Sequence, residues 1–537
     1  METRPGWAHS WNQPDVDPRL TRMSKPSGGS RLPAWVAGRS RDREAGSRAP
    51  DRILGISWKD AHNRFFLLLL GVGIIIFWLP RLPGSLWVDE TTTAWVVDTS
   101  FGEMLDRAVE FQSMAPTYYV VAWAARGVGG TSEIALRMPS VLAMGLALYL
   151  LYRLGRRLFD SETGLLAAVV LATWNEGAHL ATDARPYALG VLAFVAATLS
   201  LVRWFERGRN RDAVAYVVLA VLVVYVQYVL ATALLAHAVY VWRRRGALPS
   251  HRSLAIGGAA FGLLLLPLLP PLLATLDQRD ALSLGMQSAG ATLFVIAPPA
   301  LIVGMAAGIA FVAGRVRLES DAPVPQPAGL ALVWVWAAAP PIILFLISWL
   351  MDADVLGPQH VTQSAPAIAL LAACAIRRLG PPQVRRIILV LMVIVSLILG
   401  ASHRQYTDDW RGAIHYSNGL VDASDPVLVR SGLVQSGHAD WLLDADRAVL
   451  LLTPVEVYPT KGRPVVLPYG LSADERRYLE AEVVPIAEPA SRFSVISLSS
   501  VGDPVLPWLQ GRLRSAGFEL RQRQTFGSVV VALFERV

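Results

Sequence analysis

Long apolar blocks alternate with short polar breaks between residues 65 and 402 of the 537-residue chain. A helix that crosses a hydrocarbon core about 30 Å thick needs roughly 20 mainly apolar residues, and several blocks approach this length. The pattern therefore predicts an α-helical polytopic membrane protein with about 11–13 transmembrane helices. The expected spans lie near residues 65–80, 137–155, 163–176, 186–203, 213–227, 228–242, 253–275, 291–313, 328–350, 365–378 and 386–402.

The polar breaks are of two alternating kinds. Arginine-rich breaks occur at residues 156–160, 203–212, 242–252, 314–321 and 377–386, whereas the others carry acids or are nearly neutral. Because cytoplasmic loops of membrane proteins are enriched in Lys and Arg, we assign the arginine-rich breaks to the inside. This topology predicts a multi-pass protein of the inner (plasma) membrane, with a cytoplasmic N-terminus and an extracytoplasmic C-terminus.

Three segments lie outside the pattern of spans. Residues 1–62 are rich in Arg, Pro, Ser and Gly, which predicts a disordered cytoplasmic tail, and the first apolar block begins too late for a cleaved signal peptide. Residues 63–402 form the predicted transmembrane domain, which includes a long outer loop at 81–136. Within this loop, residues 115–130 are expected to form an amphipathic helix at the membrane surface, with Tyr118, Tyr119 and Trp123 at headgroup depth.

The composition changes at about residue 403, and residues 403–537 are predicted to form a small extracytoplasmic α/β domain. Runs rich in β-branched residues predict strands within 425–431, 448–458, 463–469, 493–499 and 528–537. Helices are expected at 472–483, which Ser472 and Asp474 could open, and at 505–517.

The overall composition excludes several classes of site. Hydrophobic residues make up 53% of the chain and charged residues 17%, against about 25% charged in a typical soluble domain. The single cysteine, Cys374, excludes an internal disulfide and a cysteine-based metal cluster. The net charge of +7 is explained by cytoplasmic arginines, so we expect no nucleic-acid partner.

Candidate site residues gather at the predicted outer ends of the spans. They are Asp89, Glu90, Arg137, His179, Asp183, Arg185, Tyr187, Gln359 and His360. Each also has a simpler explanation: Asp89 and Glu90 as loop charges, Arg137 as an arginine reaching lipid headgroups, Asp183 and Arg185 as a local ion pair, Tyr118 and Tyr119 as interface anchors, and His360 as an incidental loop residue. No metal-ligand spacing emerges from the histidines, so we expect no dedicated metal site.

The order of several motifs is more specific than any one of them. "WVDE" (87–90), "PTYYVVAWAARGVGGTSEIALRMPSVL" (116–142), "LGRRLF" (154–159) and "ATDARPYAL" (181–189) follow one another in a pattern that resembles the GT-C glycosyltransferases. The likeness is to the branch that uses lipid-phosphate sugars, which includes protein O-mannosyltransferases and lipid A aminoarabinose transferases. It is best over about residues 65–240 and continues more loosely to "DWRGAIHYSNG" (409–419).

The resemblance implies an inverting transfer of a sugar from a polyprenyl-phosphate donor to an acceptor hydroxyl on the outer face. The acceptor could be a protein, a lipid or a glycan. The acid of the first outer loop assists the attack in such enzymes, which implies Asp89 as general base, with Glu90 as its partner or substitute. Arg137 and Arg185 are then candidates to stabilise the leaving phosphate.

The remaining candidates would bind or orient substrates. Tyr187, Asp183, Tyr118 and Tyr119 could orient the sugar or the acceptor. Many relatives carry an Arg-Tyr pair near the outer end of a late span, where this chain has Gln359 and His360. Either His360 supplies the phosphate contact, or the donor differs, or activity has been lost. The paired acids and a phosphate could also share a divalent cation, Mg²⁺ or Mn²⁺, without a fixed ligand motif.

Two other classes of function compete with the enzyme hypothesis. A transporter or flippase for a lipid-linked sugar should show internal repeats, broken helices and polar groups near the membrane midplane, whereas the informative charges here gather at one face. A non-catalytic membrane scaffold, whose outer domain binds partners, would not need Asp89. We favour the glycosyltransferase.

Overall fold

The computed structural model describes residues 52–53, 56–57, 60–111, 116–277, 326–351, 355–403, 408–499 and 502–537. The chain divides into a unit that ends at Gly55 and a unit from Ile56 to Val537. The first contains the two-residue strand β1 (Arg52–Ile53), and the second begins with β2 (Ile56–Ser57). Most of the tail predicted to be disordered lies outside the described residues. All further elements belong to the second unit.

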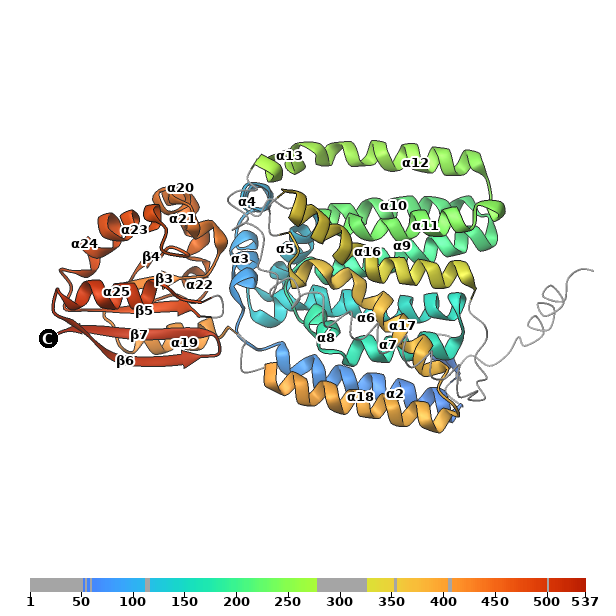
Figure 1. Ribbon diagram of the computed structural model, residues 1–537, viewed down its shortest axis with the longest axis horizontal. Coiled ribbons are helices and arrows are strands. Elements are labelled where there is room, and N and C mark those ends of the chain that lie inside the picture. Colours follow the sequence, from blue (N-terminus) through green and yellow to red (C-terminus); the bar gives the residue numbers. More distant parts are fainter. Residues whose placement is uncertain are drawn as a thin grey trace, which may run out of the picture. The chain divides into compact units, whose positions relative to one another are not determined.

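The predicted transmembrane domain is helical (Figure 1). Its elements outside the first outer loop are α2 (Ala61–Phe77), η3 (Leu79–Arg81), α6 (Glu133–Leu158), α7 (Ser161–Thr173), α8 (Asn175–Ala181), α9 (Tyr187–Arg207), α10 (Asn210–Val226), η4 (Tyr228–Leu234), α11 (Leu235–Arg243), η5 (Arg245–Ala247), α12 (His251–Leu265), η6 (Leu266–Leu268), α13 (Leu269–Asp277), α16 (Pro327–Met351), η7 (Pro358–Ser364), α17 (Ala365–Arg377) and α18 (Pro382–His403).

Six helices among the described residues are long and apolar enough to cross a membrane. They are Ala61–Arg81, Glu133–Leu158, Tyr187–Arg207, His251–Leu273, Pro327–Met351 and Pro382–Gly400. Helices also occupy the predicted spans at 163–176, 213–227, 228–242 and 365–378, but these helices are shorter. The predicted span 291–313 lies outside the described residues. The polytopic helical architecture predicted from the sequence is therefore confirmed.

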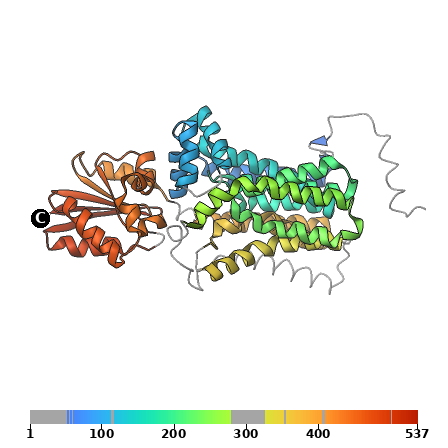
Figure 2. The same cartoon turned by 90° about the horizontal axis from the view of Figure 1, so that it is seen from above.

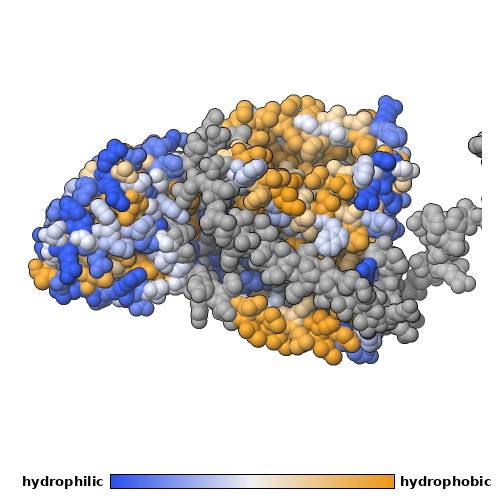
Figure 3. All heavy atoms as spheres, viewed as in Figure 1, coloured by the Kyte–Doolittle hydropathy of each residue, from blue (hydrophilic) through white to orange (hydrophobic). Residues whose placement is uncertain are grey.

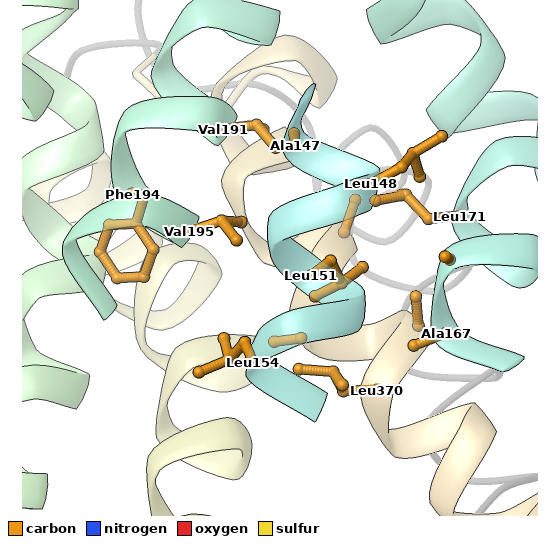
Figure 4. Packing of buried hydrophobic residues seen from close by; sticks show 14 of the residues in the cluster. Ala147, Leu148, Leu151, Leu154, Ala167, Leu171, Val191, Phe194, Val195 and Leu370 are labelled. Atoms are coloured by element: carbon orange, nitrogen blue, oxygen red, sulfur yellow. The ribbon is translucent and has the colours of Figure 1, made fainter. Parts of the chain in front are cut away.

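Helix α6 lies at the centre of the packed helices. Figure 4 shows its side chains Ala147, Leu148, Leu151 and Leu154 among apolar side chains of α7, α9 and α17. A Cβ atom at Gly155 would lie only 2.6 Å from the Cα atom of Gly164, so the absence of side chains there lets α6 and α7 approach closely. On the other side, α9, α10 and α12 pack in succession (Figures 1 and 2).

Ion pairs join several helix ends at one end of the bundle. Glu162, in the first turn of α7, lies 3.0 Å from His62 Nε2, 3.2 Å from Arg377 Nε and 3.0 Å from Arg385 Nε. Arg377 also binds Asp160 at 2.9 Å. These contacts place the arginine-rich breaks 156–160 and 377–386 at the same end, as the alternation of loops predicted.

The C-terminal domain is an α/β fold around one five-stranded sheet of order β4-β3-β5-β7-β6 (Figure 1). Strand β3 pairs in parallel with β4 and β5, whereas β7 pairs antiparallel with β5 and β6. Its elements are α19 (Trp410–Asn418), β3 (Pro426–Arg430), η9 (Val434–Gly437), α20 (Ala439–Leu443), α21 (Ala445–Leu451), α22 (Thr453–Val457), β4 (Arg463–Val466), α23 (Ala473–Tyr478), the π-helix η10 (Leu479–Val483), α24 (Val484–Ala487), β5 (Arg492–Leu498), α25 (Val505–Arg514), β6 (Phe518–Phe526) and β7 (Val529–Arg536).

Alternate residues of the central strands bury opposite faces of this sheet. Leu428 and Val495 pack in the core with α25 and α23, whereas Val429 and Ile496 pack in the core with α19 and α22. Hydrophilic side chains dominate the outer surface of this domain, in contrast with the apolar surface of the helices (Figure 3).

Two predictions for this domain were wrong. Residues 448–458 are helical rather than a strand: Asp444 caps α21 by accepting from the amides of Asp446 and Arg447, and Pro454 stands in the first turn of α22. Strand β6 was missed because its run "FELRQRQTF" is polar and mostly exposed, as suits the edge of a sheet.

Candidate functional site

The loop at residues 81–136, predicted to face outward, contains three helices, α3 (Val88–Val97), α4 (Phe101–Glu110) and α5 (Thr117–Gly129). Asp89 and Glu90 both lie in the first turn of α3, where the helix dipole favours negative charge. Successive residues of an α-helix are turned by about 100° around its axis, so the two carboxylates point in different directions. Their surroundings differ accordingly.

Glu90 is fully buried, and its carboxylate accepts four hydrogen bonds. Its carboxylate accepts from Arg137 Nε at 2.8 Å and from Arg137 Nη2, which makes a two-point ion pair. It also accepts from the backbone amides of Ala184 at 2.8 Å and Trp87 at 3.3 Å. Glu90 thus ties the start of α3 to α6 and to the segment before α9, and its predicted part in catalysis stays a prediction.

Arg137 is buried and fully engaged. Besides Glu90, it donates to the backbone carbonyls of Arg81, Leu82, Gly84 and Ser85 at 2.7–3.0 Å. A guanidinium group has five N–H donors, and these contacts use all of them. These contacts explain why Arg137 is buried, and its predicted role as a ligand of the leaving phosphate stays a prediction. Arg137 holds the turn that precedes α3.

Asp89 is the accessible acid of the pair. Its side chain is 25% exposed, and its Oδ2 atom lies 3.7 Å from Nη2 of Arg185, whose side chain is only 5% exposed. Nη1 of Arg185 donates to the backbone carbonyl of Asp89 at 3.3 Å and lies 3.5 Å from Oγ1 of Thr93. The carboxylate that Arg185 faces is thus Asp89, rather than its sequence neighbour Asp183.

The three tyrosines singled out in the sequence are buried near this pair. Tyr118 and Tyr119 of α5 are buried in a cluster with Leu86 and Ala94, and their predicted place at headgroup depth stays a prediction. Helix α5 packs against α3 and α6, and this packing buries the two tyrosines within the protein. Burial raises the pKa of both phenols, with Asp183 adding to the rise at Tyr118 and Arg185 opposing it at Tyr119. Tyr187, at the start of α9, is also buried.

Asp183 is a buried acid in the segment between α8 and α9. Its Oδ1 atom accepts from the indole Nε1 of Trp87 at 3.0 Å, and its Oδ2 atom lies 3.8 Å from Nε2 of His179. Burial, followed by the negative charge of Glu90, raises the pKa of Asp183 to about 8. The raised pKa favours the protonated carboxyl in the folded protein, and the predicted role of Asp183 in orienting the sugar or the acceptor stays a prediction.

This raised pKa predicts a pH-dependent effect of Asp183→Asn. The folded protein keeps a proton that the unfolded chain releases at its ordinary, lower pKa, so Asp183 lowers stability increasingly as the pH rises toward about 8. Asn cannot ionise and can still accept from Trp87. We expect the Tm of the variant, relative to wild type, to increase from pH 5 to pH 8 in detergent. A difference in Tm that does not change with pH would contradict the assignment.

A polar cavity of about 700 Å³ lies beside α3, on the side of Glu90 and Trp87. Its other walls come from η3, from α8 and from the start of the C-terminal domain. They include Arg81, Asn175, Glu176, His179, Asp183, Asp408, Asp409 and Arg411. Glu90, Arg137 and Asp183 all line this cavity, whereas Asp89 and Arg185 are not among its lining residues.

Residues 113–270 match the family model described as dolichyl-phosphate-mannose-protein mannosyltransferase. The structure is similar to that of ArnT from Cupriavidus metallidurans bound to undecaprenyl phosphate, with 12% identity and a TM-score of 0.53. The apo state of the same enzyme gives 13% identity and a TM-score of 0.54, and both comparisons cover 88% of this chain and 98% of ArnT. The chain has the GT-C fold of membrane glycosyltransferases. No curated protein sequence matches it.

The segment between α16 and α17 of this GT-C protein contains Gln359 and His360. Both lie in η7, where His360 Nδ1 is 2.8 Å from the carbonyl oxygen of Val355. Neither residue is among those that line the described cavity. A role for His360 in phosphate binding stays a prediction.

No set of metal ligands is assigned in the part of the GT-C protein that the structure describes. No group of three or more His, Cys, Asp or Glu side chains there is arranged to hold a metal ion. A cation shared between the paired acids and a substrate phosphate, Mg²⁺ or Mn²⁺, needs no such group and stays a prediction.

Sequence reasoning missed the residues that hold the site from a distance. Trp87 was quoted only as part of a motif, although its indole binds Asp183. Tyr458 and Thr453 of the C-terminal domain contact Leu86 and Thr91, more than 360 residues earlier. Nothing in their local sequence sets these two residues apart from ordinary surface positions.

Proposed function

We propose that this GT-C protein is a membrane glycosyltransferase that moves a sugar from a polyprenyl-phosphate donor to an acceptor hydroxyl, with inversion. The observation that carries the proposal is the pair formed by the partly exposed carboxylate of Asp89 and the buried guanidinium of Arg185, 3.7 Å apart. The family match over residues 113–270 and the fold shared with ArnT support the same class of reaction.

Asp89 is the proposed general base. An alcohol is a weak nucleophile until a positioned carboxylate accepts its proton. The acceptor oxygen then forms a bond to the anomeric carbon, the bond from that carbon to the phosphate oxygen breaks, and the polyprenyl phosphate leaves. A single displacement of this kind inverts the anomeric configuration.

Arg185 is the proposed cation for the leaving phosphate. Its guanidinium is buried at the same helix end as Asp89, and a cation in a water-poor site stabilises developing negative charge strongly. Three buried tyrosines nearby are proposed to orient the substrates: Tyr118, Tyr119 and Tyr187. The arginine-rich breaks at the opposite end of the bundle support an extracytoplasmic site in the inner membrane, with the N-terminus in the cytoplasm.

The proposal is tested with purified protein in lipid nanodiscs. The donors are polyprenyl-phosphate mannose, glucose and aminoarabinose with a ¹³C-labelled sugar, and the acceptors are the lipid and protein fractions of cell envelopes. We expect labelled product with inverted anomeric configuration by NMR and stoichiometric release of polyprenyl phosphate. Retention of configuration would refute the single displacement. In a parallel assay with sealed proteoliposomes, movement of intact donor across the bilayer without cleavage would indicate a transporter instead.

A further inference from the structure

The C-terminal domain makes buried contacts with the start of α3. Oγ1 of Thr453, at the start of α22, lies 3.2 Å from Oγ1 of Thr91, and both residues are fully buried. Thr91 donates its own hydroxyl proton to the carbonyl of Val88 at 2.7 Å, so the proton between the two threonines belongs to Thr453. The domain thus supplies a donor to the first turn of the helix that carries Asp89.

Tyr458, which directly follows α22, makes a second contact. Its hydroxyl accepts from the backbone amide of Leu86 at 3.0 Å and donates to Oε1 of Glu133 at 2.9 Å. Burial raises the pKa of Tyr458 to about 12, so the hydroxyl keeps its proton for Glu133 at physiological pH. Leu86 precedes Asp89 by only three residues.

Arg411, at the start of the C-terminal domain, binds the same loop. It donates to Oε1 of Glu133 at 2.8 Å and to the carbonyl of Pro83 at 3.0 Å, and its backbone amide donates to Oγ of Ser85 at 3.1 Å. Glu133 therefore accepts from two residues of the C-terminal domain. It lies one helical turn before Arg137, which holds Glu90.

Apolar side chains extend the same interface. Trp95 of α3 and Phe111 pack against the core of the C-terminal domain, while Val457 and Tyr458 pack against the cluster that contains Leu86 and Tyr119. The segment before α3 is thus held on one side by Arg137 and on the other by the C-terminal domain. Hydrogen bonds and packing together restrict how Asp89 is oriented.

We propose that the C-terminal domain sets the position of Asp89, with Tyr458 and Thr453 as its positioning residues. This inference rests on the proposed function, because Asp89 is the base of the proposed reaction. The C-terminal domain then contributes to the rate of sugar transfer by holding α3, the helix that carries Asp89.

The test compares Tyr458→Phe with Tyr416→Phe. Tyr416 is a matched control, because its hydroxyl bonds Gln522 within the C-terminal domain, away from α3. We expect Tyr458→Phe to lower kcat for sugar transfer by about 10- to 100-fold, since a displacement of about 1 Å in a reacting group can cost this much. KM for the donor should change by less than about twofold, because Tyr458 holds the base and makes no proposed contact to the donor. The control should match wild type.

Hydrogen exchange provides a readout that does not depend on activity. Peptides that cover residues 86–97 should exchange faster in Tyr458→Phe and in Thr453→Val than in wild type or Tyr416→Phe. If these amides and kcat are both unchanged in folded Tyr458→Phe, the inference is wrong. If the amides exchange faster in Tyr458→Phe but Asp89→Asn transfers sugar at the wild-type rate, the C-terminal domain does hold α3 and Asp89 is not the base. In that case the proposed function fails and the contact stands.

Discussion

Asp89→Asn is expected to lower the rate of sugar transfer by about 10²- to 10⁴-fold, the usual contribution of a general base. Asn has nearly the same size as Asp, and the backbone carbonyl of residue 89 can still accept from Arg185, so the geometry of α3 should survive. It cannot take the proton of the acceptor hydroxyl. The initial rate with a labelled polyprenyl-phosphate sugar in nanodiscs measures the loss, and KM for the donor should change little.

Asp98→Asn is the matched control for this substitution. Asp98 is the C-terminal cap of the same helix, and its exposed side chain binds Arg126 at 2.7 Å. The same chemical change at this end of α3 should leave the rate within about twofold of wild type, because exposed ion pairs contribute little. Equal rates for wild type and folded Asp89→Asn would remove Asp89 from the mechanism.

The helical bundle could be predicted from the sequence because its signals are local. The length of each apolar block and the charge of each arginine-rich break can be read directly from the sequence. The ion pairs of Glu162 with Arg377 and Arg385 join helix ends that the charge pattern had assigned to the same side. Residues 448–458 of the C-terminal domain could not be predicted in the same way. Their apolar run is ambiguous between strand and helix, and the cap at Asp444 decides between them.

The site was only partly predictable for the same physical reason. The predicted topology placed Asp89, Glu90, Arg137 and Arg185 near the same face of the membrane. Which acid faces which arginine depends on the rotation of α3, and this rotation is set by contacts distant in sequence, such as those of Tyr458. Asp89 and Glu90 look equivalent in the sequence, whereas in the structure one is partly exposed and the other fully buried.

Arg137→Met is expected to destabilise the protein by about 3–5 kcal/mol, because removing one partner of a buried ion pair leaves the other charge unpaired. The side chains of Arg137 and Glu90 are only 6% and 1% exposed, and Met cannot replace the donors to the four carbonyls before α3. Thermal unfolding in detergent should show a large fall in Tm. Arg137→Lys keeps the charge but should also lose stability, since an ammonium group cannot bind two carboxylate oxygens and these carbonyls together.

The double variant Arg137→Met with Glu90→Gln separates the ion pair from the carbonyl contacts. Removing both charges should recover part of the lost stability, because the unpaired carboxylate is gone. It should not recover transfer, because the turn at residues 81–85 still lacks the guanidinium that orients α3 and Asp89. Arg126→Met, which breaks an exposed pair on α5, should cost about 0–1 kcal/mol and serves as the control. Full recovery of both stability and transfer in the double variant would contradict this prediction. It would mean that Arg137 and Glu90 only neutralise each other's buried charge and do not position Asp89.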